Sequence, residues 1–184
     1  MAAVEFIATA NGTGASNTIS FSGISGDYRH LEMRAFLRST TTVATDPVVI
    51  LINGSTTNYT MSGFNSGFNG SANLWVFRDA SGASYLGNNL GPNVLGGAAS
   101  TACHSVLEIW FGNYSDATTK NAGIYKWFSP DNENNSANGL NPVGMAGWHH
   151  DDAAAAITQL SIATDSATDY WTTTSWVTLY GWRG

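Results

Sequence analysis

The stretch His30-Leu-Glu-Met-Arg-Ala-Phe-Leu-Arg38 is the clearest indication of the fold. Apolar and polar residues alternate along it with a period of two, which is the pattern of a strand with one buried face. The buried face would carry Leu31, Met33, Ala35 and Leu37. The other face would carry Glu32, Arg34, Phe36 and Arg38. The stretch therefore predicts a strand with a hydrophobic core on one side.

Further runs of apolar, aromatic and Thr residues lie on both sides of this strand, each bounded by turn residues. The predicted strands are Val4–Thr9, Thr18–Ser22, Arg29–Arg38, Val48–Ile52, Leu74–Arg78, Ser105–Gly112, Ala122–Phe128, Ile157–Ala163 and Ser175–Gly181. Many short strands between Gly, Asn and Ser turns are typical of a sandwich or barrel. The sequence therefore predicts an all-β, antiparallel two-sheet sandwich of about eight to ten strands.

The same alternation predicts the core and leaves the loops between strands. The expected core residues are Leu31, Met33, Leu37, Ile50, Ile52, Leu107, Ile109, Phe111, Val177 and Leu179. Residues 54–73 and 129–142 are rich in Asn, Ser and Gly and are expected to be long loops. Asn53-Gly54 suits a tight turn at the end of a strand. Two acids before four alanines in Asp151–Ala156 resemble the capped first turn of a helix.

Composition supports the all-β prediction and excludes several functional classes. The 184 residues include 20 Gly, 20 Thr, 19 Ser and 17 Asn but only 2 Lys, 4 Glu and 1 Gln, so strong polar helix formers are scarce. With 7 Lys and Arg against 13 Asp and Glu, the net charge is -6, which argues against a nucleic-acid partner. No apolar stretch reaches the length of a membrane helix, so no membrane partner is expected. Residues 1–184 are expected to form a single sandwich domain.

The sequence contains few features that would indicate a redox function or secretion. Cys103 is the one cysteine, so no internal disulfide can form. The first residues lack the basic and apolar regions of a signal peptide. We therefore expect the chain to fold in a reducing cytoplasm, even where it later acts elsewhere.

Three short segments resemble metal or catalytic sites, and each is incomplete. In Trp148–Asp152, the histidines His149 and His150 would point to opposite faces of an extended chain, and two converging groups do not complete a metal site. Asp131–Asn135 alternates oxygen ligands like a calcium loop. It has Ser136 at the sixth position and Pro142 at the twelfth, where Gly and a bidentate Glu are expected.

The third segment is Cys103-His104, at the head of a predicted strand. Adjacent strand residues face apart, so the imidazole would not serve as a base for the thiol, and a structural cysteine is favoured. No nucleophile elbow, phosphate loop or zinc signature occurs. We therefore predict no catalytic residues, no metal and no cofactor, and a protein that is not an enzyme.

The sequence contains seven tryptophans, more than a surface of polar, uncharged residues would be expected to carry. Most are expected in the core, since each can bury a large area. Exposed aromatic side chains can instead anchor a protein interface or stack on a carbohydrate. The candidate interface aromatics are Trp127, Trp148, Trp171 and Trp182.

Four segments, in order, resemble a group of small virion proteins of tailed phages that infect aquatic bacteria. They are His30–Arg38, Ile52-Asn-Gly followed by Asn58-Tyr, Leu107-Glu-Ile-Trp-Phe-Gly-Asn-Tyr114, and Thr178-Leu-Tyr-Gly-Trp-Arg-Gly184. The last differs from the group's usual ending in having Arg183 where Lys is commoner. The resemblance runs from about residue 28 to the end of the sequence. It implies a jelly-roll-like sandwich in a capsid or tail component, and it implies no catalytic residues.

These observations lead to two functional hypotheses. The first is a capsid decoration, or cement, protein that braces the major capsid lattice, with the major capsid protein or other virion proteins as partners. A homotrimer at quasi-threefold positions and a virion location, after synthesis in the bacterial cytoplasm, belong to this hypothesis. The alternative is the receptor-binding or glycan-binding head of a tail or head fibre, with a host glycan as partner.

Overall fold

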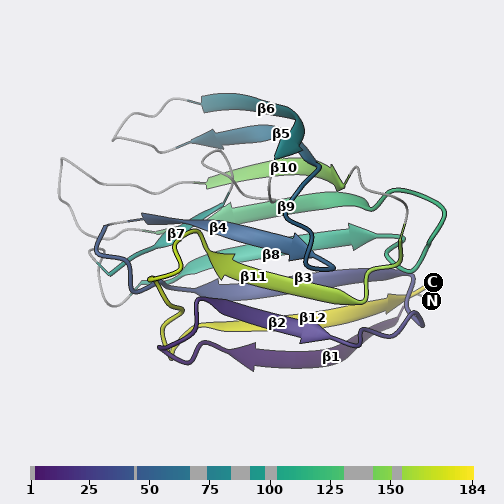
Figure 1. Ribbon diagram of the computed structural model, residues 1–184, viewed down its shortest axis with the longest axis horizontal. Helices are drawn as coiled ribbons and strands as arrows, with labels where there is room; N and C mark the ends of the chain where they lie inside the picture. Colours follow the sequence, from purple (N-terminus) through teal and green to yellow (C-terminus); the bar gives the residue numbers. More distant parts are fainter. Residues whose placement is uncertain are drawn as a thin grey trace.

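The computed structural model describes residues 3–43, 45–66, 74–83, 92–97, 103–130, 143–150 and 155–184. These residues form two antiparallel sheets and no helix (Figure 1). The strands are β1 (Ala3–Asn11), β2 (Thr18–Ser22), β3 (His30–Leu37), β4 (Thr45–Ile52), β5 (Tyr59–Ser66), β6 (Leu74–Ala83), β7 (Asn93–Leu95), β8 (Ser105–Gly112), β9 (Ala122–Phe128), β10 (Val143–His150), β11 (Gln159–Thr164) and β12 (Trp176–Arg183). The predicted all-β sandwich is confirmed.

The strand order is that of a jelly roll with an extension. The larger sheet has the order β1-β12-β3-β8-β9-β10-β5-β6, and the smaller sheet has the order β2-β11-β4-β7. Without β5, β6, β9 and β10, the remaining eight strands form two four-stranded sheets that interleave two Greek keys. The four other strands prolong the larger sheet beyond β8, as the upper part of Figure 1 shows.

The core lies between the two sheets, and all ten residues predicted for it are at most 1% exposed. In β3, the alternating side chains of Leu31, Met33, Ala35 and Leu37 face the small sheet. Residues of β4 and β11, such as Ile50 and Ile162, meet them from the other side. Burying each aliphatic side chain of this kind contributes on the order of 2 kcal/mol.

Three described strands were not predicted, which raises the number of strands to twelve in the described part of the chain. Strand β5 lies within the predicted loop 54–73, while β7 and β10 were not assigned to any strand. Glycines in β5 and β10 weaken the strand pattern in the sequence. The structure requires glycine at Gly63 and Gly144, because a Cβ at Gly63 would lie 2.2 Å from the Met145 carbonyl oxygen and one at Gly144 would lie 2.2 Å from the Trp127 indole.

The turn after β4 forms as predicted. Asn53 and Gly54 have φ angles of 51° and 72°, and the Ser55 amide donates to the Ile52 carbonyl at 2.9 Å. Positive φ at both central residues is the signature of a tight hairpin-type turn. The Asn53 carboxamide oxygen also accepts from the amides of Thr158 and Gln159, which ties this turn to the start of β11.

Two predictions concern residues outside the described part of the chain. Residues 131–142, which contain the candidate calcium loop, are not described, nor are residues 151–154 of the candidate helical turn. Residues 155 and 156 have no regular secondary structure. No helix among the described residues is long and apolar enough to cross a membrane.

Candidate functional site

The feature that stands out is the outer face of the large sheet, which points away from the small sheet. Eleven large hydrophobic side chains are exposed among the described residues. Strand alternation and register place ten of them on this outer face: Val4, Phe6, Phe64, Val76, Val106, Ile124, Phe128, Val143, Met145 and Trp176. Val43, in the segment before β4, is the exception. Exposed apolar side chains gathered on one face are typical of an interaction site.

The register arranges the outer side chains in rows that cross the strands. The first row contains, from β12 to β10, Trp176, Phe36, Val106, Phe128 and Val143. Four of these are between 39% and 49% exposed, and Phe36 is half-buried. Phe36 stacks on Trp176 with ring centroids 5.8 Å apart and on His104 with centroids 4.4 Å apart. The first row is therefore a continuous apolar and aromatic strip.

The second row is charged at its centre and apolar toward β6. It contains Thr178, Arg34, Glu108, Lys126, Met145, Phe64 and Val76. The ammonium of Lys126 lies 2.7 Å from a carboxylate oxygen of Glu108, and both side chains are about half exposed. An exposed pair of this kind contributes little to stability. Its importance is that it places one positive and one negative charge side by side in the middle of an apolar face.

The third row contains Tyr180, Glu32, Trp110, Ile124 and Gly147. Glu32 is only 3% exposed, and its carboxylate accepts from Arg34 Nε at 2.5 Å and from the Trp182 indole nitrogen at 3.0 Å. The hydrogen bond to Glu32 raises the pKa of Arg34 above its usual value. The buried carboxylate thus holds both neighbouring side chains in place on the outer face.

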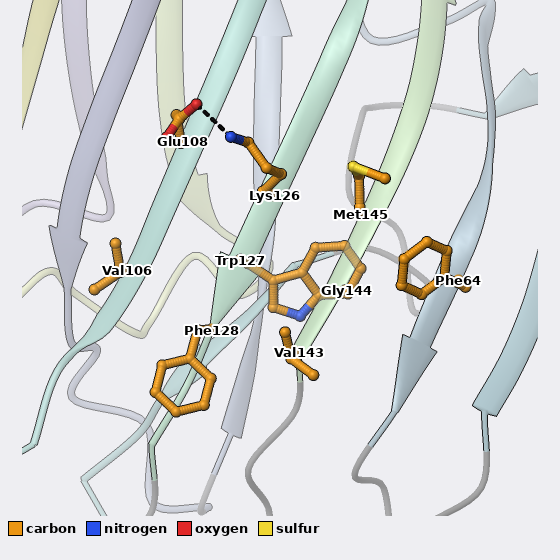
Figure 2. A pocket seen from close by; sticks show the side chains of 9 residues that line it. All are labelled: Phe64, Val106, Glu108, Lys126, Trp127, Phe128, Val143, Gly144 and Met145. Atoms are coloured by element: carbon orange, nitrogen blue, oxygen red, sulfur yellow. Dashed lines mark ion pairs between the residues drawn. The ribbon is translucent and has the colours of Figure 1, made fainter.

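An open groove of about 320 Å³ crosses the first and second rows over β8, β9, β10 and β5. Figure 2 shows Phe128, Val143, Val106, Met145 and Phe64 around it, with the Glu108–Lys126 ion pair at one end. The groove is lined mainly by carbon atoms. Among the described residues that line it, the ionisable groups are Glu108 and Lys126, which pair with each other. Its chemistry is that of a surface that binds apolar groups.

Three of the four candidate interface tryptophans occupy different positions from those expected. Trp127, Trp148 and Trp171 are at most 3% exposed and belong to the core, which corrects the prediction for these three. They lie on inward positions of their strands or, for Trp171, in a loop that the core encloses, where the indole donates to the Ile162 carbonyl. Trp182 is half-buried on the outer face and packs on Trp110 with centroids 5.1 Å apart.

The candidate metal and catalytic residues are separated or engaged in structural contacts. In β10, His149 is partly exposed and His150 is buried, on opposite faces as the extended chain requires. The His104 ring accepts or donates a hydrogen bond to the Thr174 hydroxyl at 2.8 Å, and burial, together with Arg38, lowers the His104 pKa. The part of the chain that the structure describes has no group of three His, Cys, Asp or Glu side chains placed to hold a metal.

Sequence reasoning missed the outer face, although one signal was present. Phe36 stands among charged residues at an outward position of β3, and Trp176 and Tyr180 stand at outward positions of β12. A large apolar side chain at a polar position is unexpected on a solvated face. The same signal recurs at Val106, Ile124 and Phe128, and it becomes a surface only when the register brings the strands together.

Comparisons with known proteins leave the family open. No family model and no curated protein matches the sequence. Among solved structures, an alginate lyase in complex with an alginate trisaccharide shows 10% identity over 95% of this chain and 79% of its own, with a TM-score of 0.24. The structure of infectious bursal disease virus, Gt strain, shows 9% identity over 100% of this chain and 42% of its own, with a TM-score of 0.12. Likenesses this weak carry no argument about function.

Proposed function

We propose that this chain is a structural protein of a bacteriophage virion, and specifically a capsid decoration protein that braces the major capsid lattice. The observation that carries the proposal is the open outer face of the large sheet, with ten exposed large hydrophobic side chains. A face of this kind is typical of a subunit that another protein covers in an assembly.

Two further observations support the proposal. The strand order is a jelly roll, an architecture used in viral capsid domains and in lectins. A fold alone does not decide function, so the resemblance of the four sequence segments to phage virion proteins supplies the specific direction. The extension of the sheet by β9, β10, β5 and β6 enlarges the surface that a neighbouring subunit could cover.

A receptor-binding or glycan-binding head is the second candidate, and one observation favours it. The rings of Trp176, Phe36 and His104 stack in sequence on the outer face, and Trp176 is 39% exposed. Flat aromatic surfaces beside Thr hydroxyls such as that of Thr174 can hold a sugar ring by stacking and hydrogen bonding.

Purified virions distinguish the two functions. A decoration protein occurs in hundreds of copies, which a stained gel of particles measures against the major capsid protein. Because a ligand that binds only the assembled shell stabilises it, shells stripped of the protein should break at a lower temperature and regain resistance when it is added back. Few copies, unchanged shells and lost adsorption to host cells would reject decoration and favour receptor binding.

A further inference from the structure

We infer that the outer face of the large sheet is covered by the same face of a second copy of this chain, in a two-fold dimer. The inference rests on the proposed function in one respect, since it names the protein subunit that covers this face, and it replaces the homotrimer expected for a decoration protein. The axis would lie in the interface, parallel to the strands and between β8 and β9. Two sheets packed in this way stay about 10 Å apart with their strands nearly aligned.

The register of β8 and β9 makes the face complementary to itself. An axis in this position places each outward residue of β8 opposite the β9 residue that it pairs with inside one chain. Val106 then meets Phe128 of the second copy, and Trp110 meets Ile124 of the second copy. Both contacts join apolar side chains, and each occurs twice by symmetry.

The charges at the centre of the face match in the same way. Glu108 and Lys126 are partners in the register, so the axis places the Glu108 carboxylate opposite the Lys126 ammonium of the other copy, and the reverse. The two intrachain pairs would become one network of four alternating charges. Alternation of this kind is favoured over isolated exposed pairs and disfavours any register that brings like charges together.

The match continues on the next strands outward. The same axis places β3 opposite β10, which brings Phe36 against Val143 and the alkyl part of Arg34 against Met145. Glu32 faces Gly147, where the missing side chain leaves room for the Glu32–Arg34–Trp182 contacts. Neither Glu32 nor Arg34 meets a like charge on these strands, and His30 faces His149 of the second copy.

The available area is sufficient for a stable pair. Three rows across the six strands from β12 to β5 cover a footprint of about 600 Å² on each copy, from a strand spacing of about 4.8 Å and a rise of about 3.3 Å per residue. A specific interface buries about 500 Å² or more on each partner. Around the central Glu108–Lys126 pair the footprint is mainly apolar, and it becomes polar at Thr178 and Ser62, as interfaces generally do at their rim.

The first test is the mass of the purified full chain in solution, measured by light scattering on a sizing column and by sedimentation at micromolar concentration. We expect a mass twice that of the single chain, which is 19.5 kDa. Phe128→Asn should weaken the dimer at least about tenfold, because an apolar contact is lost at two symmetric positions. Val43→Asn is the matched control, since Val43 is 57% exposed but lies off the face, and it should leave the dimer unchanged.

A charge exchange tests the geometry of the two-fold arrangement. Lys126→Glu alone puts like charges together across the axis and should weaken the dimer at least about tenfold. The double variant E108K/K126E restores the alternation in both copies and should restore dimerisation. A partner of another kind keeps its own charges opposite this pair, so with such a partner the double variant would not recover. In a self-paired register that keeps Glu108 and Lys126 of the two copies apart, Lys126→Glu alone would leave the dimer unchanged. Circular dichroism and thermal melting of each variant show that loss of the dimer is not loss of the fold.

Each other outcome overturns the inference. A monomer at about 100 μM, a mass three times that of the chain, or a dimer that ignores Phe128→Asn and the charge exchange would each reject a two-fold pair on this face. These results leave the virion proposal standing, because copy number and shell stability are measured separately. A dimer in solution, together with absence of the protein from purified virions, would instead reject the virion proposal and support the dimer.

Discussion

Asp46, in β4, is a buried carboxylate with an unusual environment. Its side chain is 3% exposed. Burial raises its pKa to about 6; Asp169 and Asp165 add to the rise, and a hydrogen bond from Ser39 opposes it. The folded state therefore holds the Asp46 proton at pH values where an ordinary aspartate has lost it.

This pKa predicts that the protein is less stable at neutral than at mildly acidic pH. Below about pH 4 the Asp46 carboxyl is protonated in both the folded and the unfolded state, and its contribution to the free energy of unfolding is fully present. That contribution is lost as pH rises toward 6, because the unfolded state releases the proton more readily than the folded state. Asp46→Asn should raise the free energy of unfolding at pH 7.5 and flatten its fall between pH 4 and 6. Urea titrations of both proteins at several pH values measure this, and parallel profiles would contradict it.

Leu179, in β12, tests the core at the level of one side chain. It is fully buried between the two sheets, so Leu179→Ala removes apolar contacts and leaves a cavity. We expect the free energy of unfolding to fall by about 2–5 kcal/mol. Thr56→Ala, at an exposed position, should change it by less than about 0.5 kcal/mol. Equal effects of the two substitutions in chemical denaturation would show that Leu179 is not a core residue.

At the scale of the strand, β10 depends on glycine at one position and not at another. A Cβ at Gly144 would lie 2.2 Å from the Trp127 indole, whereas one at Gly147 would approach no atom more closely than 4.0 Å. Gly144→Ala should therefore destabilise the fold by about 1–3 kcal/mol through overpacking. Gly147→Ala, in the same strand, meets no close atom of its own chain, so it should leave the fold of a single chain unchanged or slightly more stable. Thermal melting compares the pair, and a loss for Gly147→Ala as large as for Gly144→Ala would contradict the packing argument.

The same glycines explain which strands could be predicted from the sequence. Alternation of apolar residues identified β3, β8 and β12, and the core positions on them, because side-chain period depends on the local chain alone. In β10 the inward positions include Gly144 and Ala146, small residues that accommodate Trp127 and other neighbours. Small residues are needed at these positions because a side chain of another strand packs against them, and a single sequence does not show which strands are in contact.

At the scale of the molecule, the two-sheet class could be predicted while the binding face could not. Turn residues and strand formers determine the class. The outer face depends on register, which pairs Val106 with Phe128 and Glu108 with Lys126 from strands about 20 residues apart. The prediction of interface tryptophans was wrong for three of the four, because these three fill the core, while smaller side chains such as Val106 and Ile124 form the exposed surface.

The charge distribution of the whole molecule predicts how it holds a particle. Charged residues are only 11% of the chain, and the cations of Arg34, Lys126 and Arg183 are each paired with a carboxylate of the same chain. Few charges remain to bind a partner electrostatically, so attachment should rest on apolar contacts, backbone hydrogen bonds and several weak sites acting together. Interfaces of this kind depend weakly on ionic strength.

We expect the protein to stay on purified virions across a salt series up to about 1 M, where the Debye length is about 3 Å. The measurement is the amount released into the supernatant at each step. Complete release of the unmodified protein at moderate salt would show that ion pairs hold it and would reject apolar attachment.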